Sequence, residues 1–263
     1  MANVLAATAQ AGSARLAYSR ISTSPNPALA SQLNGTGQID FTHDDVRTTE
    51  VDHDVEFSSS GPEDSPSRVT HFTNHTEAIG IRTSVYQGFG ITYGAERWSK
   101  LGIHRNPDAG LGLTWAGDAN DALGPLGADQ RIIAVESLGS ATLDGTPTTR
   151  YLVTSAPVCA VPKSAHLSSV SEPRHTMLWL DTYGRLVEAR TSQSIDSHPP
   201  SSMFAGQPGL AKRMRGRVAT TATLHFSAFG QPVHISAPPA DEVHTPTVIG
   251  VSEITCASKA HSS

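Results

Sequence analysis

Alternation of apolar and polar side chains between Arg217 and Pro239 constrains the fold more than any other feature of this sequence. The apolar parity is carried by Val218, Thr220, Ala222, Leu224 and Phe226, and the other parity by Arg217, Thr221, Thr223 and His225. A period of two residues is typical of a β-strand with one dry and one wet face. A turn at Ser227–Gly230 and renewed alternation after it predict a long antiparallel hairpin across the whole stretch.

The same period recurs along the chain, with short turns between its segments. The expected strands are Ser13–Ser22, Gly35–Thr42, Val46–Phe57, Arg68–Asn74, Glu77–Tyr86, Ile91–Trp98, Arg131–Leu138, Thr148–Ser155, His175–Asp181 and Arg185–Ser192. With the hairpin they give a single antiparallel sheet of about 11 strands, in which strands consecutive in sequence are neighbours. A sheet of this size must curl, and its dry concave face needs a cover. The sequence therefore predicts a mostly β half-barrel of the α+β class.

Two segments without strand periodicity are the candidates for this cover. Ala2–Ala11 is rich in alanine, lacks proline and glycine, and is followed by Gly12, so it favours a helix. Asp118 can cap a short second helix that continues to Leu123 within a glycine-rich segment. We expect both helices to lie over the concave face. Residues 1–243 would then form one domain, and residues 244–263 a polar C-terminal tail.

The charge balance argues against a nucleic-acid partner. The chain has 19 basic and 24 acidic residues and a net charge of −5. Its only basic run, Lys212–Arg217, is typical of a solvated strand end. No apolar run reaches the ~18 residues of a membrane-spanning helix. The N-terminal residues lack the basic and apolar regions of a signal peptide, so contact with a membrane surface would require a leader that this sequence does not contain.

The sequence has 2 cysteines, Cys159 and Cys256, without a CxxC spacing. A zinc site or a thioredoxin-type motif is therefore not expected. In an oxidising compartment the two thiols could form a disulfide, which would close a loop of about 100 residues. Two separate buried thiols are the alternative, and the spacing does not decide between them.

Sequence motifs for catalysis or cofactor binding are missing. The chain contains no HExxH, no GxSxG and no GxxxxGK[ST]. Its 12 histidines include His43 and His53, which flank aspartates in a pattern more typical of a solvated hairpin than of a metal site. We therefore expect no catalytic residue, no metal site and no cofactor. A Ser-His-Asp triad depends on spatial neighbours, so a hydrolase stays among the alternatives.

Five segments carry a resemblance to a known family. They are AGSAR (Ala11–Arg15) after the alanine-rich helix, GTGQIDF (Gly35–Phe41), LDGTPTTRYLVT (Leu143–Thr154), LWLDTYGRLVEAR (Leu178–Arg190) and TLHFSAFGQPVHISAPPADEV (Thr223–Val243). In order and spacing they resemble the actinobacterial surface lipoproteins of the LppX/LprG type, distant kin of the LolA/LolB lipoprotein carriers. The resemblance implies an extracytoplasmic, lipid-anchored, non-enzymatic protein of the cell envelope, whose half-barrel holds acyl chains.

On this basis we expect a monomeric carrier that binds a lipid or an acylated small molecule in an apolar cavity. The residues expected to line the cavity or its mouth are Ile39, Phe41, Ile79, Ile81, Val85, Trp98, Trp115, Leu123, Leu126, Ile133, Val135, Tyr151, Trp179, Leu224, Phe226 and Ile235. A slip of one residue in a strand would move its side chains to the opposite face. The alternatives are a structural or protein-interaction module of the envelope with a filled core, and an envelope hydrolase.

Overall fold

A computed structural model describes most of the chain. It covers residues 2–25, 30–58, 68–81, 84–93, 96–102, 122–123, 130–157, 173–197 and 216–244. Trp115, Leu126, Cys159 and Cys256 lie outside these residues, as do positions 118–121 of the expected second helix and positions 245–263 of the expected tail.

The described residues are mainly β-strands, with one α-helix at the start and one short 3-10 helix near the end. The elements are α1 (Ala2–Ala9), β1 (Ser13–Thr23), β2 (Ser31–Asp40), β3 (Asp45–Ser58), β4 (Arg68–Ile81), β5 (Ser84–Tyr93), β6 (Glu96–Gly102), β7 (Gln130–Leu143), β8 (Thr146–Pro157), β9 (Arg174–Asp181), β10 (Leu186–Ser197), β11 (Gly216–Ser227), η7 (Ala240–Glu242) and β12 (Val243–His244). They confirm most of the expected strands, but β4 runs unbroken where a break after Asn74 was expected.

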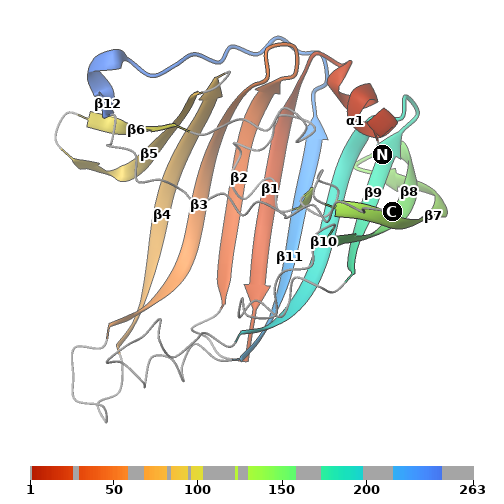
Figure 1. Ribbon diagram of the computed structural model, residues 1–263, viewed down its shortest axis with the longest axis horizontal. Coiled ribbons are helices and arrows are strands. Elements are labelled where there is room, and N and C mark those ends of the chain that lie inside the picture. Colours follow the sequence, from red (N-terminus) through yellow and green to blue (C-terminus); the bar gives the residue numbers. More distant parts are fainter. Residues whose placement is uncertain are drawn as a thin grey trace, which may run out of the picture.

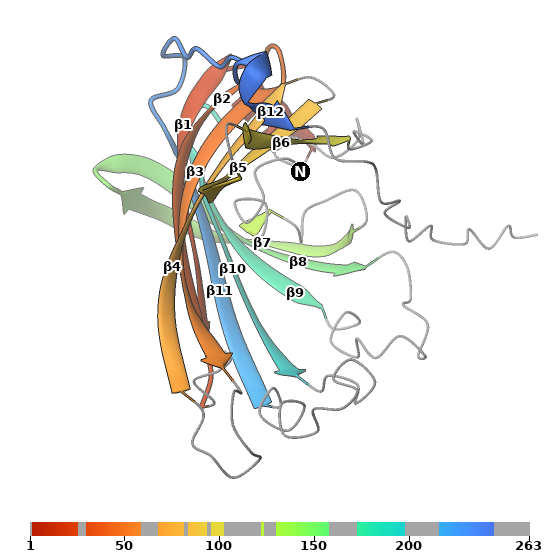
Figure 2. The ribbon, with the colours of Figure 1, turned by 90° about the vertical axis from the view of Figure 1, so that its left-hand side faces the viewer.

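All the strands belong to one open, curled sheet of 12 strands (Figures 1 and 2). Their order is β12-β6-β5-β4-β3-β2-β1-β11-β10-β9-β8-β7. The sheet therefore consists of two antiparallel ribbons, β1 to β6 and β7 to β11, which are joined where β1 pairs with β11. The expectation of one curled sheet is confirmed, and its described strand pairs are antiparallel as expected except for the pair of β12 and β6. The expectation that sequence neighbours pair throughout is wrong at this junction and at β12, which is parallel to β6.

The long hairpin expected from Arg217 to Pro239 is also wrong. β11 ends at Ser227, and both of its edges are occupied, by β1 and by β10. The chain then turns: the Gly230 amide donates to the carbonyl of Ser13, and the Ser13 hydroxyl donates to the carbonyl of Gln231. From there it follows the end of the sheet to η7 and β12 (Figure 1). Prolines 232, 238 and 239 have no amide donor for a ladder, which favours this unpaired course.

Helix α1 lies on the concave side of the sheet, next to β10 (Figure 1). It ends at Ala9 rather than at the expected Ala11; the amide of Gly12 donates to the carbonyl of Ala9, and Gly12 has a positive φ of 79°. An eight-residue helix is about 12 Å long, so it covers only one end of the concave face. Among the described residues α1 is the only α-helix, and the expected cover by two helices is therefore not found in them. Within the same ranges, no helix is both long and apolar enough to span a membrane.

The hydrophobic core lies on the concave face. Directly opposite residues in an antiparallel pair project from the same side of a sheet, so the register assigns each side chain to a face. Leu16 lies opposite Phe226, Tyr18 opposite Leu224, and Ala14 opposite Ile39, and all of these side chains are buried. Val4, Leu5 and Ala9 of α1 pack against this cluster, and Ala122 and Leu123 are buried within it.

Candidate functional site

The concave face brings together one group of the residues expected to line a cavity. Its members on strands are Ile39, Val85, Tyr151, Leu224 and Phe226. Two more expected residues lie outside the strands but belong to the same core. Leu123 is buried in it, and the centroid of the Phe41 ring lies 6.3 Å from that of the Phe226 ring. Phe41 and Tyr151 are only partly buried.

A second group of the expected residues lies on the convex face. Ile79 is opposite Arg47, Trp98 is opposite Gly88, and Trp179 is opposite Glu188. Ile81 is two residues after Ile79 on the same strand and shares its side. The sequence pattern grouped Ile79, Ile81 and Val85 by a single parity. Val85 belongs to the next strand, β5, and pairs with Gly80 rather than with Ile79. Val85 therefore lies on the concave face, whereas Ile79 and Ile81 lie on the convex face.

The remaining expected residues are exposed, lie outside the strands or fall outside the described residues. Ile133 and Val135 are 52% and 57% exposed on β7, the last strand of the sheet; Val135 pairs with Val153 and so lies on the concave face, but outside the buried core. Ile235 lies in the extended segment that follows β11, where it is half-buried. Trp115 and Leu126 fall outside the described residues.

The concave face changes from apolar to polar along its strands. Near α1 it carries Ala14, Leu16, Ile39, Val46 and Phe226, all buried. Further along the same strands, this face carries Arg20 on β1 and Glu50 and Asp52 on β3, with the buried Leu33 of β2 between Arg20 and Asp52. The boundary between the two zones lies at Tyr18, whose ring is buried and whose hydroxyl donates a hydrogen bond of 2.6 Å to Oε1 of Glu50.

The polar zone was missed in the sequence, although β3 carries a signal for it. Val46, Thr48, Glu50 and Asp52 share one parity, so the concave side of β3 goes from apolar to acidic within a few residues. A change of this kind along one parity marks the point where a strand's dry face becomes wet. Two hydroxyls on the concave face, Thr48 Oγ1 and Ser155 Oγ, are buried without a hydrogen-bond partner among the described residues.

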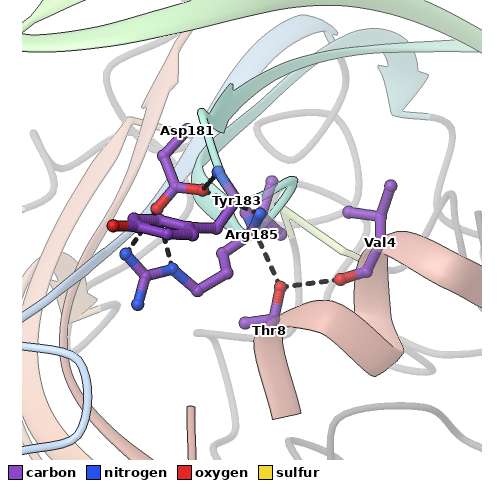
Figure 3. A network of polar contacts seen from close by, with 6 residues as sticks. Val4, Thr8, Asp181, Tyr183 and Arg185 are labelled. Atoms are coloured by element: carbon purple, nitrogen blue, oxygen red, sulfur yellow. Dashed lines mark hydrogen bonds and ion pairs between the residues drawn. The ribbon is translucent and has the colours of Figure 1, made fainter. Parts of the chain in front are cut away.

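Buried threonines tie the concave face to the segments that cover it. The hydroxyl of Thr8 on α1 donates to the carbonyl of Val4 at 2.8 Å and accepts the amide of Leu186 on β10 at 2.9 Å (Figure 3). On the same strand, the Thr191 hydroxyl donates to the carbonyl of Ala122 at 3.0 Å. These hydrogen bonds fix the position of α1 and of Ala122 over β10, because a buried donor or acceptor without a partner is costly.

The side chain of Arg185 lies beside the Tyr183 ring at the β9–β10 turn, close to α1 (Figure 3). Arg185 donates from Nε to Oδ2 of Asp181 at 2.7 Å, and its guanidinium lies 4.7 Å from the Tyr183 ring and 4.4 Å from the Phe229 ring. Asp181 also accepts the amides of Tyr183 and Arg185 at 2.9 Å. These contacts lock the turn between β9 and β10 to the turn after β11.

The carboxylate of Glu188 is buried on the convex face. Its Oε1 accepts a hydrogen bond from Arg190 at 2.9 Å, and its Oε2 lies 3.7 Å from Nδ1 of His225. The Arg190 guanidinium lies 5.4 Å from the Trp179 ring. The interaction with Glu188 raises the pKa of His225, against the opposing effect of burial, and Asp144 contributes in the same direction. Among the described residues, no three histidine, cysteine or acidic side chains form a group able to hold a metal ion.

Comparisons with known proteins give few matches. No protein-family model matches the chain, and no curated protein matches it. Among solved structures, the lipoprotein LppX of Mycobacterium tuberculosis is 11% identical, with a TM-score of 0.41 over 89% of this chain and 97% of that chain. LprF from Mycobacterium bovis is 13% identical, with a TM-score of 0.38 over 90% and 96%. A DUF1329 family protein from Desulfovibrio piger is 9% identical, with a TM-score of 0.27 over 86% and 90%.

The expected resemblance to LppX/LprG-type lipoproteins is confirmed in that LppX and LprF both match along most of their length. All three TM-scores are below 0.5, so these structures carry no weight for function. The functional proposal therefore depends on the two faces of the sheet itself.

Proposed function

We propose that the protein is a non-enzymatic carrier, located outside the cytoplasm, that holds a lipid or another acylated molecule against the concave face of its sheet. The observation that supports this best is the division of that face into an apolar zone near α1 and a polar zone that begins at the Tyr18 hydroxyl. A lipid has the same division. The extracytoplasmic location follows from the family resemblance of the sequence motifs.

The proposed ligand would place its acyl chain along the apolar zone and its head group beside Glu50 and Asp52. Removing a methylene from water contributes ~0.8 kcal/mol, so a chain of about a dozen methylenes would contribute about 10 kcal/mol before ordering costs. The proposed contact residues are the expected ones that belong to the concave core, namely Ile39, Phe41, Val85, Leu123, Tyr151, Leu224 and Phe226. Trp115 and Leu126 are added on the sequence pattern alone.

Two measurements on the full chain test the proposal. Organic extraction of the purified protein, followed by mass spectrometry, would release a stoichiometric lipid. Delipidated protein titrated with a fluorescent fatty acid would show saturable binding. The absence of both a co-purifying lipid and saturable uptake would rule out the carrier function.

A second candidate is a structural or protein-interaction module with the same sheet and a filled core. The observation that favours it is the burial of Leu16, Leu224 and Phe226, which the protein's own residues leave 2%, 0% and 1% exposed. This candidate predicts that extraction yields no lipid and that the protein unfolds with the same stability before and after extraction. A carrier loses stability when its ligand is removed, because a ligand that binds only the folded state stabilises it.

A further inference from the structure

The sheet is open, and its two end strands differ in how their outer edges are treated. At one end, Val243 and His244 of β12 pair with Trp98 and Ser99 and so cover part of the edge of β6. At the other end, β7 pairs with β8 on one side and has no neighbour on its other side among the described strands. β7 is also among the longest strands, with 14 residues. A strand of this length at the edge of the described sheet offers backbone donors and acceptors to another strand.

The side chains of this edge are apolar where a soluble edge strand is usually charged. Ile133 and Val135 are two of the large apolar side chains that remain exposed in the described part of the chain. Neighbouring positions 131, 134, 136 and 137 are exposed as well. Val135 lies opposite Val153 on the concave face, so its apolar side chain extends that face to the margin of the sheet, where a further strand would continue it.

The sequence of this edge is complementary to itself. Arg131–Glu136 reads RIIAVE, with a cation at one end, an anion at the other and apolar residues between them. If two copies pair in antiparallel orientation about a two-fold axis between Ile133 and Ala134, Arg131 of each copy lies opposite Glu136 of the other. Ile132 then lies opposite Val135. Opposite charges and apolar pairs in these positions each stabilise a sheet.

We propose that β7 is a self-association edge, through which two copies of this chain pair in antiparallel orientation along Arg131–Glu136. The resulting interface is isologous, as in most homodimers. It is also short, because a bulge between Ser137 and Gly139 follows it and another bulge, between Ile132 and Ala134, lies at its centre. Bulges increase the local twist and limit the ladder. The dimer is therefore reversible, and its population depends on protein concentration. The sequence led us to expect a monomer. That expectation did not consider this edge, because a sequence pattern does not show which strand lies last in a sheet.

Sedimentation velocity of the full chain over a range of concentrations tests the pairing. The parent chain is expected to change from monomer to dimer as its concentration rises. Glu136→Arg places two arginines opposite each other at both ends of the ladder, and the dimer should weaken by about tenfold or more. The double variant Arg131→Glu/Glu136→Arg restores opposite charges, and dimerisation should return. Asp241→Arg, an equal charge change at an exposed residue of η7, is the matched control and should leave the dimer intact.

The result that would overturn the proposal is a parent chain that stays monomeric at every concentration, whether or not other proteins use this edge. A dimer that Glu136→Arg leaves unchanged, or that the charge-swapped double variant fails to restore, would overturn it as well. Circular dichroism checks that each variant is folded. Should Glu136→Arg lose its native spectrum, Val135→Lys tests the same edge at an exposed side chain and should also weaken the dimer.

Discussion

The ring of Tyr18 occupies the space that a side chain at Gly35 would need. The two residues lie opposite each other on β1 and β2, and a Cβ atom on Gly35 would lie 2.1 Å from Cζ of Tyr18. The ring crosses over β2 at this point, so its hydroxyl reaches Glu50 on β3. Three strands are thereby linked at the boundary between the apolar and polar zones. Gly35 lies within a strand and not in a turn. Glycine is needed there because the Tyr18 ring covers its backbone.

Gly35→Ala should destabilise the protein by about 1–3 kcal/mol, because the new methyl group overlaps the Tyr18 ring and forces it to move. The free energy of unfolding in urea measures the effect. In a Tyr18→Leu background the space is open, so the same substitution should cost much less, and the double-mutant cycle should show strong coupling. Equal costs in both backgrounds would show that the two residues do not compete for this space.

Thr8→Val should destabilise the protein by about 1–3 kcal/mol, since it leaves the buried amide of Leu186 without its acceptor at nearly constant volume. Thr8→Ser keeps the hydroxyl and is the matched control. Thermal or urea unfolding compares the two variants. If Thr8→Ser costs as much as Thr8→Val, the hydrogen bond between α1 and β10 is not what makes Thr8 important.

His225 should make stability depend on pH. The interaction with Glu188 raises the pKa of His225 above its usual 6.5 in the folded state. The protonated ring is thus stabilised by folding, and this contribution is fully present below the unfolded-state pKa and lost as the pH rises through the folded-state pKa. The free energy of unfolding of the parent should therefore fall across that interval relative to His225→Gln. His175→Gln, which removes a histidine bonded to Thr154, serves as the control. Identical pH profiles of the parent and His225→Gln would refute the linkage.

Adjacent residues on β8 allow a test of which face binds lipid. Tyr151 lies opposite Leu178 on the concave face, and Leu152 lies opposite Met177 on the convex face. Both are half-buried. Tyr151→Ala should weaken binding of a fluorescent fatty acid by about three- to tenfold through lost apolar contact, whereas Leu152→Ala should leave it unchanged. Equal effects of the two substitutions would indicate that binding does not occur at the concave face.

The sequence pattern predicted individual strands better than their partners. The first strand was expected at Ser13–Ser22 and is found at Ser13–Thr23. A period of two identifies such a segment because each residue's side is set locally. Partners are not set locally: nothing near Ser227 indicates that its strand pairs with Arg15. The predicted hairpin failed for this reason, since renewed alternation at Val233 and Ile235 was interpreted as a returning strand although no free edge of β11 remained.

The candidate site was predictable only where parity could be counted within one strand. Leu224 and Phe226 were correctly grouped on a single face. Trp98 and Trp179 are buried as core residues usually are, but on the convex side, where Trp98 lies against Gly88 and Trp179 lies opposite Glu188. A large apolar side chain predicts that a residue is buried. It does not predict on which face of the sheet the residue lies, because the face depends on the register of the strands.

The pairing of β1 with β11, which includes Arg15 and Ser227, has a consequence for the synthesis of the protein. The ribbon β1 to β6 is synthesised first, yet the strand that joins it to β7 to β11 leaves the ribosome last among these strands. Until then a nascent chain carries the unpaired edge of β1, and contacts between such distant residues form slowly. A chaperone that shields β1 during synthesis or export would therefore raise the yield of correctly assembled protein.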